Sequence, residues 1–105
     1  MKEHLKELYN YLIERKCKDL CVYDLSKEEQ ESDFIFLATL PSVEANKKLA
    51  SVIMNDFEID DFPEGFHKGE WIIFDFNQCV LHLFIAPMRE KYNLDKMWQS
   101  KKIVF

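Results

Sequence analysis

Apolar residues recur at helical spacing in two parts of the chain, and both stretches predict helices. Residues 2–16 carry apolar side chains at intervals of three and four, which form one stripe on a helix. The second helix is predicted to begin after Pro41, with Ser42 as its N-cap, and to end near Asn55. The side chains expected to face the core are Leu5, Leu8, Tyr9, Leu12 and Ile13 in the first helix and Val43, Leu49, Ala50, Val52, Ile53 and Phe57 in the second.

Short apolar runs between polar segments predict strands. Residues 20–25 form one such run, and residues 34–39 form a second that is almost entirely apolar, as expected of a strand buried on both faces. The polar residues 26–32 between them predict a loop. Residues 56–69, which are acidic and contain both glycines, predict a second loop with a short edge strand. The tail, residues 101–105, is expected to be either a frayed end or a last edge strand.

The stretch 71–85 predicts a β-hairpin. Two apolar runs flank Asn77 and Gln78, and asparagine tolerates the positive φ of a two-residue turn. This turn would fix the pairing residue by residue, as far as Trp71 opposite Phe84. Because side chains alternate along a strand, the hairpin has two faces. The face expected in the core is Ile72, Phe74, Phe76, Cys79, Leu81 and Leu83, and the other face is Trp71, Ile73, Asp75, Val80, His82 and Phe84.

Asp75 and His82 lie diagonally on the second of these faces, within reach of a hydrogen bond. A carboxylate that orients an imidazole can serve acid–base catalysis, but no nucleophile is placed beside them, because Cys79 faces the other way. We therefore expect a histidine held on a half-buried sheet face by a structural hydrogen bond. A metal site made by these two residues and His67 matches no ligand spacing, and the chain lacks a glycine-rich phosphate loop. No catalytic residue, metal or cofactor is predicted.

The segment after the hairpin carries a second group of apolar residues. Pro87 is expected to end the hairpin, and the residues from Arg89 to Trp98 predict a helical turn or short helix with Tyr92, Leu94, Met97 and Trp98 as its apolar positions. The aromatic residues Tyr92 and Trp98, together with Trp71 and Phe84 of the hairpin, admit two interpretations. Either the chain's own helices cover them, or they form a recognition surface for another protein. Periodicity favours neither interpretation.

Charge narrows the class of partner. The formal net charge is −5, and residues 19–67 alone hold twelve acids against three bases. Such a surface repels phosphate backbones, so little direct contact with nucleic acid is expected. It would favour a basic protein partner and speed the encounter with it. The alternative is an acidic surface that only aids solubility.

Length and cysteine content limit the number of domains and the cellular compartment that the chain suits. A chain of 105 residues fits one domain, residues 1–105. Its three cysteines have neither metal nor redox spacing and suit a reducing compartment. The first residues lack an apolar targeting segment, and no apolar run approaches the ~20 residues of a membrane span. We therefore expect a cytoplasmic protein, and a homodimer formed through the hairpin face remains open.

Three segments carry a joint pattern that is more specific than any one of them. They are Trp71 to Phe76 with its aspartate, Val80 to Phe84 centred on a histidine, and Arg89 to Trp98 with its arginine, tyrosine and tryptophan. Weaker matches lie upstream at Val22 to Leu25, at Ser32 to Phe34 and at Glu64-Gly65. With these residues the chain resembles the ribosomal silencing factor family, also called Iojap-related, over residues 19–98.

The resemblance implies an α/β (α+β) fold, with a mixed sheet and flanking helices, like that of nucleotidyltransferases without their catalytic residues. It implies a protein that is not an enzyme. Such a protein would bind large-subunit ribosomal protein fourteen on the large ribosomal subunit, block joining of the small subunit and repress translation when nutrients are short. The residues expected to contact this partner are Trp71, Asp75, His82, Phe84, Arg89, Tyr92, Leu94, Met97 and Trp98. The alternatives are a degenerate nucleotidyltransferase or small hydrolase using Asp75 and His82, and a large-subunit assembly factor.

Overall fold

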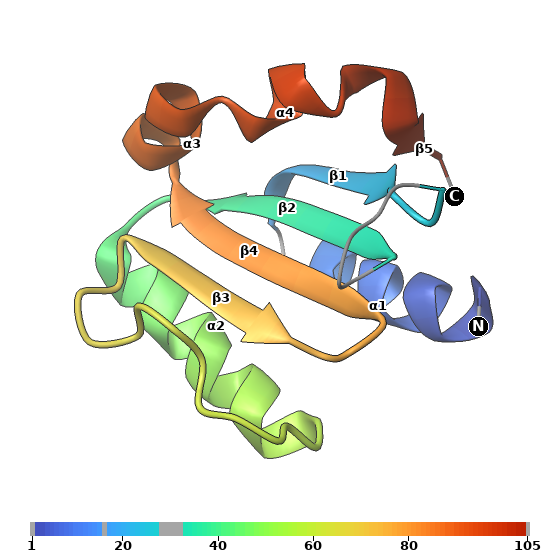
Figure 1. Ribbon diagram of the computed structural model, residues 1–105. Helices are drawn as coiled ribbons and strands as arrows, with labels where there is room; N and C mark the ends of the chain where they lie inside the picture. Colours follow the sequence, from blue (N-terminus) through green and yellow to red (C-terminus); the bar gives the residue numbers. More distant parts are fainter. Residues whose placement is uncertain (1, 16, 28–32, 105) are drawn as a thin grey trace.

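A five-stranded mixed sheet organises the chain, and the computed structural model describes residues 2–15, 17–27 and 33–104 of it (Figure 1). The strand order is β3-β4-β2-β1-β5; β2 and β4 run parallel, and the other neighbouring pairs are antiparallel. This confirms the predicted fold class. The helices and strands are α1 (Lys2–Glu14), β1 (Lys18–Asp24), β2 (Phe34–Leu40), α2 (Val43–Asp56), β3 (Trp71–Asp75), β4 (Cys79–Ile85), α3 (Ala86–Tyr92), α4 (Leu94–Met97), a 3-10 turn (Gln99–Lys101) and β5 (Lys102–Ile103).

The helices divide between the two faces of the sheet. Figure 1 shows α1 and α2 on one face, while α3, α4 and the 3-10 turn lie across the other. The larger core fills the space between the sheet and the first two helices. A smaller apolar cluster lies on the opposite face, under the C-terminal segment. The two sides of the sheet therefore differ in how completely the chain covers them.

The two predicted helices are confirmed, with small changes at their ends. The first, α1, ends at Glu14 rather than at residue 16. Ile13, expected to face the core, is instead 48% exposed in the last turn of α1. The second, α2, begins as expected: the Ser42 hydroxyl accepts a hydrogen bond from the backbone N–H of Ala45, which satisfies a donor at the helix N-terminus. One member of its buried side was not predicted, because Asn46 is a polar residue. Helical spacing places Asn46 on the same side as Leu49, Ala50 and Ile53, and its side chain is fully buried.

The predicted strands are also confirmed. Every residue of β2 is buried, because α1 and α2 cover one side of this strand and the C-terminal segment covers the other. The tail forms the edge strand β5, which pairs with β1. In the second predicted loop, Glu64 forms a two-residue bridge with Ile73 at the outer edge of β3, as the expected edge strand would. Most of the first predicted loop, residues 28–32, lies outside the described residues.

The hairpin pairs in the predicted register, from Trp71 opposite Phe84 to Asp75 opposite Val80. Asn77 takes the positive φ of 73° that the turn requires. The expected core face is buried against α1 and α2, with Phe76 partly exposed at its end. The hairpin therefore presents its other face, which begins with Trp71, to the side of the sheet that carries the C-terminal segment.

Candidate protein-binding surface

The second face of the sheet is covered over β1 and β2 and open over β3. Tyr23, Leu37 and Phe84 lie beneath the C-terminal segment with at most 2% of their surface exposed. The side chains that close over them are Met88 of α3, Leu94 of α4 and the following Trp98, whose ring lies 6.0 Å from that of Tyr23. Figure 1 shows β3 at the free edge of the sheet, with no helix drawn across its side of this face.

The uncovered part of this face is apolar and aromatic. It consists of Trp71, Ile73, Val80 and Tyr92, with the buried His82 (9% exposed) at its floor, and we call these five residues the open sheet patch. The Trp71 ring contacts those of Tyr92 and His82 at centroid distances of 4.9 and 5.8 Å. Ile73 and Val80 are each half-buried, and Tyr92 is 49% exposed. An aromatic and aliphatic surface of this kind has the composition of a protein-binding site.

His82 is bound by Trp71 and not by Asp75. The indole N–H of Trp71 donates to Nδ1 of His82 across the hairpin, with a nitrogen–nitrogen distance of 2.8 Å. Burial lowers the pKa of His82 to about 4, so the ring is neutral at pH 7. The expectation of a structural hydrogen bond on this histidine is confirmed, but its predicted donor–acceptor pair is wrong.

Asp75 has a different role from the one expected. Its carboxylate accepts a hydrogen bond from the backbone N–H of Asn77, within the hairpin turn, at 2.8 Å. An aspartate commonly bonds the backbone two residues onward in a tight turn, and here this local bond competes successfully with the diagonal histidine. The side chain is exposed at the edge of the patch. The Asp75–His82 pair on which the alternative of a hydrolase depended is therefore not formed.

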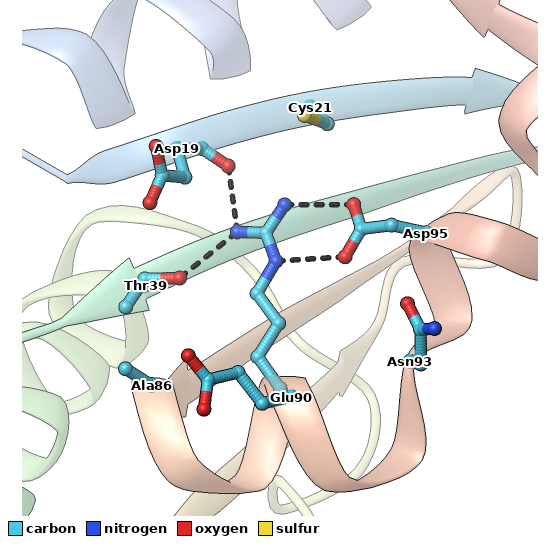
Figure 2. Close-up of a pocket in the computed structure, with 8 residues that line it drawn as sticks. Asp19, Cys21, Thr39, Ala86, Glu90, Asn93 and Asp95 are labelled. Carbon is cyan, nitrogen blue, oxygen red and sulfur yellow. Dashed lines mark hydrogen bonds and ion pairs between the residues drawn. The ribbon is translucent and has the colours of Figure 1, made fainter.

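Arg89 ties the C-terminal helices to the sheet through hydrogen bonds to Asp95, Asp19 and Thr39, which Figure 2 labels. Its Nε and Nη2 atoms donate to the two carboxylate oxygens of Asp95 at 2.9 and 2.8 Å. Nη1 donates to the main-chain oxygen of Asp19, at 2.6 Å, and to the Thr39 hydroxyl, at 2.9 Å. Only 11% of the Arg89 side chain is exposed. One guanidinium thus joins α3, α4, β1 and β2.

Asp95 completes this network from the other side. Its carboxylate also accepts a hydrogen bond of 2.6 Å from the Tyr23 hydroxyl on β1. The hydrogen bonds from Arg89, together with that from Tyr23, hold the pKa of Asp95 below its ordinary value. Burial and the bond to Asp95 raise the pKa of Tyr23. Residue Asp19, whose carbonyl Arg89 binds, has a φ of 49°, which turns that carbonyl away from regular strand geometry.

The expected partner contacts therefore fall into two groups. Phe84 has no exposed surface and Arg89 is engaged inside the chain, so neither side chain is available to a partner in this conformation. The sequence pattern could not predict that Arg89 is engaged inside the chain, because its partners are up to 70 residues away. The expected contacts that reach the surface are Trp71, Asp75, Tyr92, Leu94, Met97 and Trp98, with His82 only 9% exposed.

A polar cleft of about 380 Å³ lies beside Arg89, between β1 and the C-terminal helices. The Arg89 guanidinium and the Asp95 carboxylate that line it already bind one another. Among residues 2–15, 17–27 and 33–104, no three histidine, cysteine or acidic side chains come together as a metal site would require. In the same ranges, no helix is long and apolar enough to cross a membrane.

The fold and this surface define a small α+β domain with a mixed sheet whose second face is only half covered. The family described as "Ribosomal silencing factor during starvation" matches residues 1–104, and the chain belongs to this family. Names in the family are those of ribosome-associated regulators. The chain is 29% identical to Ribosomal silencing factor RsfS of Treponema pallidum over 93 residues, which cover 85% of this chain and 84% of that one.

Two further relatives add to this identification. The chain is 24% identical over 98 residues to mouse "Mitochondrial assembly of ribosomal large subunit protein 1", covering 87% of this chain and 43% of that longer protein. A crystal structure of a protein from Chromobacterium violaceum superimposes with a TM-score of 0.83 and 26% identity, over all of this chain and 91% of that one. The arrangement of sheet and helices described above is therefore that of the family.

Proposed function

We propose that this protein silences ribosomes: it binds large-subunit ribosomal protein fourteen on the large ribosomal subunit and sterically blocks joining of the small subunit. Translation would then be repressed when nutrients are short. Membership of the ribosomal silencing factor family supports the proposal at the level of the ribosome. The observation that carries the binding mode is the open sheet patch, an aromatic and aliphatic surface at the β3 edge of the sheet that stays partly exposed around the buried His82.

The patch and its surroundings suit a basic protein partner. The open sheet patch and the exposed Met97 would supply the apolar centre of the interface. Acidic residues between 19 and 67 would steer a basic ribosomal protein toward the complex. A total buried area of about 1,600 Å² is the ordinary size for such an interface. Binding to ribosomes would place the protein in the cytoplasm.

Sedimentation of purified subunits tests this function. The protein is added to large subunits before small subunits, and the mixture is separated on a sucrose gradient. We expect the protein to migrate with the large subunit and the peak of joined ribosomes to fall. Undiminished joining, with no protein on the large subunit, would reject the proposal. If the protein does migrate with the large subunit, a crosslinker of short span should attach it to ribosomal protein fourteen.

A role in assembly of the large subunit is the second candidate, and the name of the mouse relative favours it. An assembly factor would bind the same subunit without blocking the joining of mature subunits. Cells that lack the protein would then accumulate free large subunits containing immature ribosomal RNA. Sequencing the RNA ends in those free subunits distinguishes this role from silencing.

A second copy of the chain would compete with the ribosome for the same apolar surface. If the open sheet patch also forms a homodimer, the dimer must separate before the protein binds the subunit. Analytical ultracentrifugation over a hundredfold range of protein concentration measures this. A dimer that persists at the concentrations used for ribosome binding would contradict use of the patch for ribosomal protein fourteen.

A further inference from the structure

His82 occupies the middle of the second sheet face. On β4 it pairs with Ile73 of β3, on the open side, and with Leu37 of β2, on the covered side. Its side chain therefore lies at the boundary between the covered part of the sheet and the rest of the open sheet patch. Only 9% of the residue is exposed, so whatever it offers to a partner is confined to a small part of the ring.

The hydrogen bond from Trp71 determines which nitrogen of His82 carries the proton. An indole nitrogen can only donate, so Nδ1 of His82 must accept with its lone pair. A neutral imidazole has one protonated nitrogen, which must then be Nε2. The pKa of about 4, lowered by burial, agrees with a ring that stays neutral at pH 7. Trp71 is thus a positioning residue: it holds the ring and selects the tautomer in which Nε2 donates.

Nε2 of His82 is a polar atom of this face that still needs a partner. No described residue accepts a hydrogen bond from it. It is not enclosed either, because in the described part of the chain the enclosed side-chain atom that lacks a partner is Oδ1 of Asn46. The Nε2–H group therefore reaches solvent at the floor of an apolar patch. Covering it with an apolar surface would leave this donor without an acceptor, which disfavours binding.

We propose that the Nε2–H of His82 is the polar anchor of the open sheet patch and donates a hydrogen bond to an uncharged oxygen, such as a main-chain carbonyl, of the bound ribosomal protein. The proposal rests on the function proposed above and deepens it. The surroundings of His82 explain why the acceptor is uncharged. Arg89 is already bound to Asp95, while Asp75 and Lys91 place one negative and one positive charge at the margin of the patch. The patch therefore offers no excess positive charge to a carboxylate or a phosphate.

Affinity measurements on three variants test this donor. His82→Phe keeps a ring of similar size and removes both nitrogens, while His82→Gln keeps an amide N–H at a comparable reach. His4→Phe, on the exposed surface of α1 across the sheet, is the matched control. Each protein is titrated against purified large subunits in a pelleting assay at pH 7.5. Melting temperatures and far-ultraviolet circular dichroism check that each variant is folded.

We expect His82→Phe to bind about tenfold more weakly or worse, because its ring leaves the partner's oxygen without a donor. His82→Gln should recover most of this loss, and His4→Phe should bind like the unmodified protein. Equal affinity of His82→Phe and the unmodified protein would overturn the inference and leave the proposed function standing. Equal losses in His82→Phe and His82→Gln would also overturn it, because the role of the residue would then be structural. If the unmodified protein itself does not bind the large subunit, the proposed function fails and this inference fails with it.

Two further measurements address the tautomer and the charge of the acceptor. Nitrogen-15 spectra of the free protein should show His82 protonated at Nε2 alone, and protonation at Nδ1 would contradict the assignment. The ratio of affinities between the unmodified protein and His82→Gln should stay constant from pH 7.5 to pH 6. A carboxylate acceptor would raise the pKa of His82 in the complex, so a ratio that grows as the pH falls would overturn the uncharged acceptor.

Discussion

Arg89 and Asp95, six residues apart, form a two-bond ion pair that joins α3 to α4, with nitrogen–oxygen distances of 2.9 and 2.8 Å. The same guanidinium reaches the main chain of β1 and the Thr39 hydroxyl on β2. The two short C-terminal helices have no buried residues of their own. Their position over the sheet therefore depends on this network and on the few side chains that pack beneath them.

Arg89→Lys should loosen this attachment. Lysine is a point charge without the forked geometry, so it cannot keep both bonds to Asp95 and the two bonds to the sheet. We expect the free energy of unfolding to fall by about 2–3 kcal/mol, in the range for a damaged buried network. Backbone amides of residues 86–98 should exchange with solvent faster, which hydrogen–deuterium exchange measures.

Arg15→Lys is the matched control for Arg89→Lys. The Arg15 side chain is 33% exposed, and its contact with Asp56 is a longer one of 3.7 Å. Loss of a surface pair of this kind costs at most about 1 kcal/mol. If the two substitutions lower stability equally, Arg89 does not have the special role in holding the C-terminal helices that its geometry indicates.

Stability should depend on pH through His82. Its pKa is about 4 in the folded protein and about 6.5 in the unfolded chain. Between these values the unfolded chain binds more protons, so stability falls as the pH is lowered from 6.5 to 4. The shift of roughly 2.5 units corresponds to a loss of about 3 kcal/mol. Chemical denaturation at half-unit steps of pH measures this loss, and His82→Gln should remove most of it. An unchanged pH profile in that variant would contradict a buried neutral histidine.

Gly65→Ala should disturb the edge strand that carries Trp71. A Cβ atom at Gly65 would lie 2.1 Å from the main-chain oxygen of Trp71, and the residue has a φ of +79°. Both the left-handed backbone and the clash with a backbone atom oppose any side chain there. We expect a loss of about 2–4 kcal/mol, together with weaker binding to the large subunit.

Gly69→Ala separates the cost of the left-handed backbone from the cost of the close approach to Trp71. Gly69 has nearly the same φ, +78°, but its Cβ would meet side-chain atoms of Val43 and Lys47, at 2.7 and 2.8 Å. Lys47 is flexible and can move, and Val43 is a stiff side chain but not backbone, so this substitution should cost less than Gly65→Ala, whose clash is with a main-chain oxygen. Equal losses would show that backbone conformation alone, and not the close approach to Trp71, accounts for the effect.

Met97→Asp should weaken binding without unfolding the protein. Met97 is 66% exposed beside the covered part of the second sheet face, so a charge there costs little in the free protein. In the proposed interface the charge would be desolvated, and we expect affinity for the large subunit to fall about tenfold or more. Ile13→Asp, at a 48% exposed position of α1 behind the sheet, should leave binding unchanged. A similar loss in both variants would place the binding surface elsewhere.

The sequence by itself determined the elements and the two faces of the hairpin. Its helical spacing predicted α1 and α2, and the apolar run that became β2 predicted a strand covered on both sides. The turn at Asn77 fixed the register, because side chains alternate strictly along paired strands once the turn is known. Asn46 could also have been found from its helical spacing with Leu49 and Ile53, although its polar side chain argued against burial.

Only the tertiary structure decided how the second sheet face is used. The family resemblance predicted that Arg89 contacts the partner. Its side chain instead turns inward, because Asp19, Thr39 and Asp95 converge on it from three separate segments. His82 was expected to bind Asp75, but a local turn bond engages that carboxylate and leaves Trp71 as the donor. Local periodicity reports which side of its own element a residue occupies. Which distant groups reach that side, and how much of it stays open, depends on packing between segments far apart in the chain.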